Sequence, residues 1–193
     1  MVQVLPSQLK LTEVSITNYH RVYASESMSG IQYRHDSGIQ WYKGTITLLA
    51  YGYENVRILN GFLASLRGRL NAFKLPLGGA YAHPDLVVNP TVNTAHSRGA
   101  NEIKLSHTGK LISMGSVFTV PNDTKVYTVL ENIDGDGVFS IVPSLKKPQQ
   151  HLAEANFKNP HVTALLDGNE TTIQHSEGGL IAEATLSWTE LMQ

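Results

Sequence analysis

Eight histidines are the residues of this chain that most invite a chemical role, and their spacing argues against a metal site. No two of them form a His-Glu-x-x-His or a close His-x-His pair, and the chain has 0 cysteines, so a zinc site would have to be assembled from distant loops. Most lie in polar, loop-like segments, which favours solvation over ligation. The sequence therefore predicts no metal and no cofactor. The eight are His20, His35, His83, His96, His107, His151, His161 and His175.

The motifs that usually mark an enzyme are missing as well. There is no Gly-x-Ser-x-Gly elbow and no paired set of carboxylates. Asp134-Gly135-Asp136-Gly137 weakly resembles a calcium loop, but Val138 and Leu145 stand where an EF-hand needs oxygen ligands. A hairpin turn explains these four residues better, because glycine accepts the positive φ of a tight turn. We expect a protein that is not an enzyme.

Basic residues gather around one segment. Arg57, Arg67, Arg69 and Lys74 lie in or just after a stretch with helical periodicity. A solvated helix face is the ordinary explanation, and a contact with another subunit or with phosphate is the alternative. The three arginines are therefore the candidate interface residues of this sequence.

The segment from about Glu54 to Leu70 is the one convincing helix. Its apolar residues recur every three or four positions, as on the buried face of an amphipathic helix. Asn55 is the candidate N-cap, and we expect the helix to end near Arg67 or Gly68. The apolar stripe is Val56, Leu59, Leu63, Leu66 and Leu70.

The rest of the chain predicts short strands separated by turns. Many Val, Ile and Thr residues, with glycines and prolines spread throughout, are typical of a mainly β protein. Residues 25–38 are polar and contain glycine, which predicts a loop. Residues 78–99 are expected to be a domain boundary or a long loop, and residues 146–159 a connector. The expected strands are residues 10–17, 19–25, 39–50, 71–77, 102–106, 116–120, 124–131, 138–143, 161–166 and 179–191.

Two domains follow from this order. We expect a β-sandwich built from residues 1–78 and 161–193, with the helix on its flank, because the helix and the terminal strands need each other's apolar faces. Residues 79–160 would form an inserted small β-barrel, since several short strands follow one another there.

Charge and hydropathy exclude some partners. Charged residues are 16% of the chain and the formal net charge is −1, which argues against a duplex-DNA binder and a polybasic membrane patch. No apolar run approaches the roughly 18 residues of a membrane span. The first residues lack the pattern of a secretory signal, so we expect a soluble protein in a reducing compartment.

The element order resembles the distal tail proteins of long-tailed bacteriophages (siphoviruses), of the type with a tail-tube-like domain and an inserted OB-fold. Three groups of residues carry the resemblance. They are the strand 41–49 with the following helix and the exit strand 72–76; Gly115 to Val120 with Lys125-Val126-Tyr127, Gly137 and Pro143-Ser144-Leu145; and the closing stretch 161–191. This chain has Gly115-Ser116 where the family pattern has Gly-Asp.

The resemblance implies a structural virion protein. It would form a homo-oligomeric ring, a hexamer, at the distal end of the tail tube. The ring would contact the tail tube protein on one side and the tail-tip hub or fibre proteins on the other. Phage DNA would pass transiently through its lumen, no membrane would be involved, and assembly would take place in the host cytoplasm.

Two other functions remain open from the residues. A carbohydrate-binding β-sandwich would use aromatic platforms, which Trp41 and Trp188 could supply. A single-strand-binding OB-fold needs a basic groove with stacking aromatics. For that groove the candidates are Phe118, Tyr127, Phe139, Lys110 and Lys125.

Overall fold

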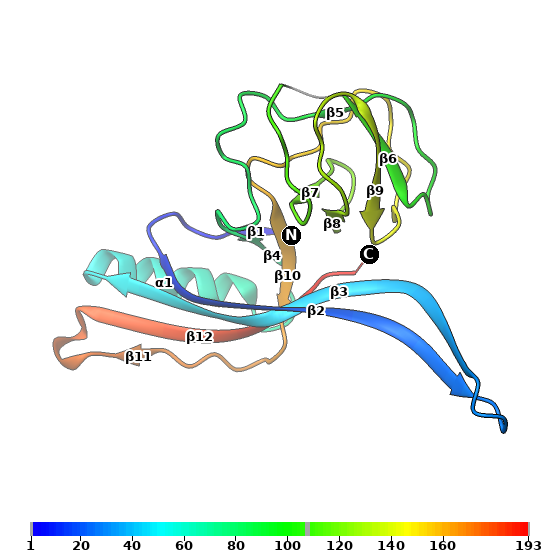
Figure 1. Ribbon diagram of the computed structural model, residues 1–193. Helices are drawn as coiled ribbons and strands as arrows, with labels where there is room; N and C mark the ends of the chain where they lie inside the picture. The colour runs from blue at the N-terminus through cyan, green and yellow to red at the C-terminus, as the bar shows by residue number, and fades with distance from the viewer. Residues whose placement is uncertain (1, 107–108, 193) are drawn as a thin grey trace. The chain divides into compact units, whose positions relative to one another are not determined.

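The computed structural model describes residues 2–106 and 109–192 and is mainly β with one helix, which confirms the predicted fold class (Figure 1). The chain divides into two compact units. The first unit comprises Met1–Tyr19, Trp41–Leu75 and Thr163–Gln193, and the second comprises His20–Gln40 and Pro76–Val162. The boundaries expected from the sequence lay at residues 78 and 161 and placed residues 20–40 in the first domain.

A seven-stranded sheet contains the strands of the first unit. Its order is β1-β4-β10-β12-β3-β2, with β11 paired to β12 outside that path. β12 pairs antiparallel with both β10 and β3, and β1 pairs parallel with β4. The strands are β1 (Gln3–Val4), β2 (Lys10–Glu26), β3 (Gln32–Tyr51), β4 (Phe73–Pro76), β10 (His161–Leu166), β11 (Gln174–His175) and β12 (Ile181–Glu190), with a short 3-10 helix at Glu177–Gly179 before β12.

Helix α1 (Tyr53–Leu66) lies along the sheet of the first unit beside β12 (Figure 1). It buries Val56, Leu59, Phe62, Leu63 and Leu66, so most of the predicted apolar stripe is confirmed. Within the described residues, no helix combines the length and apolarity needed to cross a membrane.

The ends of α1 differ in part from the sequence prediction. The helix ends as expected at Arg67, whose φ of 52° is the left-handed conformation of a C-cap. Leu70 therefore lies beyond the helix and is 69% exposed, so its place in the buried stripe was wrong. The N-cap is Gly52 and not Asn55, whose side-chain Nδ2 donates to the Tyr51 carbonyl from inside the first turn.

Strand β12 shows the clearest match between sequence pattern and burial. Its first eight residues alternate between exposed and buried, and the half-buried Thr189 precedes the buried Glu190. Ala182, Ala184, Leu186 and Trp188 belong to the buried set. Such alternation is expected of a strand with one face against a core and the other in solvent.

The second unit contains a five-stranded sheet with its loops, together with the parts of β2 and β3 that lie within His20–Gln40. The strand order is β5-β6-β9-β8-β7. Its core includes Phe118, whose ring stacks on Phe157 at 4.8 Å between centroids and lies 5.6 Å from that of Tyr127. The expected strands of this region are confirmed within a few residues. They are β6 (Glu102–Ser106), β7 (Val117–Thr119), β8 (Val126–Val129) and β9 (Gly137–Val142), joined by β5 (Thr91–Val92).

The loop predicted at residues 25–38 is mostly strand. β2 is one continuous strand of 17 residues through the positions expected as two, and β3 already begins at Gln32. The turn between them is short, with the Ser27 amide donating to the Ile31 carbonyl and Gly30 at a φ of 78°. The prediction failed because almost no residue here is buried on either face, so the apolar alternation that marks a strand is missing.

Candidate functional site

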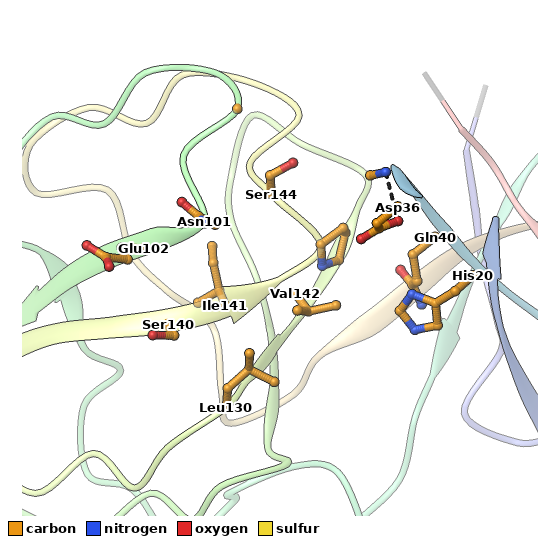
Figure 2. Close-up of a pocket in the computed structure, with 13 residues that line it drawn as sticks. His20, Asp36, Gln40, Asn101, Glu102, Leu130, Ser140, Ile141, Val142 and Ser144 are labelled. Atoms are coloured by element: carbon orange, nitrogen blue, oxygen red, sulfur yellow. Dashed lines mark hydrogen bonds between the residues drawn. The ribbon is translucent and has the colours of Figure 1, made fainter. Parts of the chain in front are cut away.

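A polar pocket of about 440 Å³ lies within the second unit (Figure 2). Strands β2 and β3 supply three of the residues that line this pocket, His20, Asp36 and Gln40. The remaining labelled residues come from β6, β9 and the loops beside them, and include Asn101, Glu102, Leu130, Ser140, Ile141, Val142 and Ser144.

Hydrogen bonds to the backbone organise the hairpin side of this pocket. Asp36 Oδ1 accepts a hydrogen bond of 2.9 Å from the Gly38 amide, drawn in Figure 2. Lys146 Nζ donates to the Gly38 carbonyl at 2.8 Å. The pocket thus presents an imidazole, two carboxylates, hydroxyls and amides, which suit a polar or cationic group. Among the described residues, no hydrogen bond joins His20 to a hydroxyl or carboxylate of the pocket.

A serine and a histidine do meet elsewhere in the second unit. His83 Nε2 lies 2.6 Å from Ser116 Oγ, although 33 positions separate them. Ser116 Oγ donates its own hydrogen to the Ser113 carbonyl at 2.6 Å. The imidazole must then be the donor in the His83–Ser116 contact, so it cannot take a proton from this hydroxyl as a general base would. The geometry is that of a partly buried structural hydrogen bond, since Ser116 is buried and His83 is half-buried.

The other histidines are not gathered. Among the described residues, no group of three or more His, Asp or Glu side chains could hold a metal ion, and His107 lies outside those residues. His96 has a defined role in the fold, since its Nε2 accepts a hydrogen bond of 2.9 Å from the Lys104 amide. Burial lowers the pKa of His96 below its ordinary value. Asp85 is exposed, and a hydrogen bond from Lys110 lowers its pKa.

The three candidate interface arginines belong to the first unit, and all are exposed. Arg57 lies on α1, Arg67 caps its C-terminus, and Arg69 follows in the turn before β4. Gly68 between the last two has a φ of 61°, and the Asn169 backbone lies against it. The sequence therefore identified an exposed basic group at the end of the helix, and it named His20 of the pocket only as one of eight histidines without a metal-binding pattern.

The most unusual surface is the hairpin of β2 and β3, which we call the β2–β3 hairpin (Lys10–Tyr51). β2 is the last strand in the order of its sheet. All but two of its residues are exposed, among them Val14, Tyr19, Val22 and Tyr23. The Tyr19 ring lies 4.2 Å from that of Trp41 on the neighbouring strand. A long edge strand with exposed aromatic and β-branched side chains is the kind that pairs with another chain.

No family model matches this sequence, and no curated protein matches it.

Proposed function

We propose that this protein is a structural subunit that assembles with copies of itself through β2 into a closed ring. The observation that carries the proposal is the exposure of β2 along 17 residues at the end of its sheet. An edge strand leaves a row of N–H and C=O groups without ladder partners, and natural proteins shorten, charge or cover such edges. This one is long and apolar in several places, so a partner strand or surface would complete it.

The composition of β2 supports an interface rather than a solvated edge. Its charged residues are Lys10, Glu13, Arg21 and Glu26, which cancel to zero net charge. Val14, Tyr19, Val22 and Tyr23 are between 42% and 52% exposed. Aromatic residues and arginine are enriched in protein interfaces. In a head-to-tail arrangement each copy would use β2 and a different surface of its neighbour, which closes into a ring when the rotation permits.

The finer assignment rests on the resemblance of the element order to siphovirus distal tail proteins. In that role the ring would be a hexamer at the distal end of the tail tube, with a lumen for DNA. It would join the tube protein to the tail-tip or fibre proteins and turn over no substrate. The net charge of −1 is consistent with a lumen that does not bind the phosphates of the passing DNA.

The test is the mass of the purified full-length protein, by light scattering, together with negative-stain electron microscopy. We expect a closed ring, and Val14→Lys with Val22→Lys should dissociate it to the 21.2 kDa chain. Val87→Lys is the matched control, since Val87 is 86% exposed in the second unit. A monomer at all concentrations would contradict the ring. Label on the capsid or along the tail shaft of virions would contradict the distal position alone.

A further inference from the structure

The far part of the β2–β3 hairpin is exposed on both faces. Between residues 20 and 36 only Ser27 is half-buried, and burial begins again at residue 37. We call residues 20–36 the arm and residues 37–40 its root, and both belong to the second unit. The β12 ladder on β3 stops at Lys43, so the arm is a ribbon of two strands. Such a ribbon is at best marginally stable in water, so the arm depends on what holds its ends.

The outer end of the arm is closed by local contacts. The Ser27 amide donates to the Ile31 carbonyl at 2.9 Å, and the Ile31 amide donates to Ser27 Oγ at 3.1 Å. The Arg21 guanidinium lies 5.3 Å from the centre of the Tyr23 ring. These contacts join residues of the arm to one another, so they do not fix the arm on the rest of the second unit.

The root contains a kink in β3. Gly38 has a φ of 65°, the left-handed conformation that favours glycine and that inside a strand is typical of a bulge. The Asp36 carboxylate accepts from the Gly38 amide (Figure 2). Ser37 Oγ donates to the Arg21 carbonyl at 2.6 Å, which ties β3 to β2 at this point. The root thus has a defined shape that depends on the conformation of one glycine.

A lysine from the chain that follows β9 binds the carbonyl of this kink. Lys146 Nζ donates to the Gly38 carbonyl at 2.8 Å, although 108 positions separate the two residues. Lys146 is itself held, because its amide donates at 2.9 Å to the hydroxyl of the buried Tyr127, which also bonds Asp123. Hydrogen bonds from charged donors are stronger than those between neutral groups. The ammonium group of Lys146 therefore connects the root of the arm to the core of the second unit.

The space beside this bond is a polar pocket rather than a packed core. Gly38 and Gln40 line the pocket of about 440 Å³ together with Ser144. Close apolar packing is what usually fixes one element against another, and an open polar pocket supplies little of it. The position of the root therefore depends strongly on the contact between Lys146 and Gly38.

We propose that Lys146 is a latch and Gly38 the hinge of a movable arm. While the ammonium is bound to the Gly38 carbonyl, the root keeps its kink and β2 and β3 stay paired along the arm. When this bond breaks, water solvates the ammonium, Gly38 adopts other φ values that glycine allows, and the arm opens as one unit. Lys146 is thus a positioning residue for the arm. The inference concerns a single chain, so it goes beyond the proposed ring and does not depend on it.

Hydrogen–deuterium exchange of the full chain, followed by mass spectrometry, tests the latch. Lys146→Met should speed exchange in residues 20–36 by about tenfold, the factor expected when an opening equilibrium loses one charge-assisted hydrogen bond. Exchange in β8 and β9 should stay unchanged, which a general loss of stability would not allow. Lys146→Arg keeps a cationic donor and should preserve slow exchange. Lys147→Met makes the same change at the next half-buried lysine and should have no effect on the arm.

Gly38→Ala tests the hinge and keeps the experiment decisive if Lys146→Met folds poorly. Nothing lies within 4 Å of a Cβ placed on Gly38, so alanine disturbs the φ of 65° without a clash. Exchange in the arm should rise as in Lys146→Met, and the double variant should exceed neither single variant.

Three results would overturn the proposal: unchanged exchange of the arm in Lys146→Met and Gly38→Ala, an equal rise in Lys147→Met, or a rise shared by β8 and β9. Light scattering on the same samples reports their mass, and variants are compared at equal mass. Failure of the ring would therefore not affect the result.

Discussion

Gly44 lies directly opposite Trp188 on the β3–β12 ladder, and the backbone carbonyl of Ser15 occupies the place where a Cβ at residue 44 would be. Trp188 is fully buried and is among the largest side chains of the core. Three strands thus meet closely at one position, with β2 against β3 on one side and β12 on the other. Only a residue without a side chain permits this approach.

Gly44→Ala should therefore destabilise the protein. The new methyl group would overlap backbone rather than a movable side chain, so the strands themselves must shift. We expect a loss of about 1–3 kcal/mol in the free energy of unfolding, the range of overpacked cores. Urea denaturation followed by circular dichroism would measure it.

Gly61→Ala is the matched control for that change. Gly61 is exposed in the middle of α1, and nothing lies within 4 Å of a Cβ placed there. Alanine should raise stability by roughly 0.5–1 kcal/mol, because glycine is the poorer helix former. Equal effects of the two alanines would show that the strands at Gly44 are not packed as described.

Leu63 and Leu70 test the end of the helix. Leu63 is 6% exposed on α1, so Leu63→Ala should cost on the order of 2–5 kcal/mol, as other core truncations do. Leu70 is 69% exposed beyond the C-cap, so Leu70→Ala should change stability by less than about 0.5 kcal/mol. Thermal or urea unfolding of both variants compares them directly. Similar decreases in the free energy of unfolding for the two variants would show that Leu70 is buried with the rest of the stripe.

What the sequence predicted well depends on burial of one face. The apolar stripe of α1 and the alternating burial of β12 both arise because one face of the element packs against a core. Both could therefore be predicted from the sequence. Residues 32–38 have no such side, so the same rule mistook a strand for a loop. A strand that is exposed on both faces shows no alternation of apolar and polar residues, so its sequence does not distinguish it from a loop.

The site residues were hidden for a different reason. His83 and Ser116 are 33 positions apart, and the pocket walls join residues 20–40 to residues 99–144. Gln149 lies in a segment whose sequence predicted only a connector. Gln149 is buried and pairs with His96, which is far away in the sequence, and no local pattern predicts this pairing.

His96 should make stability depend on pH. Its Nε2 must be unprotonated to accept from the Lys104 amide, and burial lowers its pKa in the folded state. The folded protein then binds fewer protons than the unfolded chain, whose histidine titrates near 6.5. The full stability is present above that value, falls as the pH drops below it, and stops falling below the lowered folded pKa.

His96→Gln supplies an amide oxygen in place of the imidazole nitrogen and does not titrate. The unfolding free energies of the two proteins should be measured by urea denaturation from pH 8 to pH 5. We expect the free energy of the variant to depend less steeply on pH than that of the wild type. His175→Gln, at an exposed position of β11, controls for the loss of any one histidine. Identical slopes for wild type and His96→Gln would mean that another group governs this range.

The exposed arginines of the first unit test where the proposed ring makes its contacts. Arg57, Arg67 and Arg69 are solvent-exposed in the single chain, so replacing each with glutamine should change the unfolding free energy by no more than about 0.5 kcal/mol. If they lie at contacts with a neighbouring subunit or tail protein, the same variants should lower the assembled fraction in mass photometry. Arg98→Gln, at an exposed position of the second unit, is the control. Full assembly of all three variants would contradict their role as interface residues. An electron-microscopy map with the three arginines facing an open lumen, unbalanced by carboxylates, would contradict the electrostatic argument, because such a ring of charge would retain the phosphates of passing DNA.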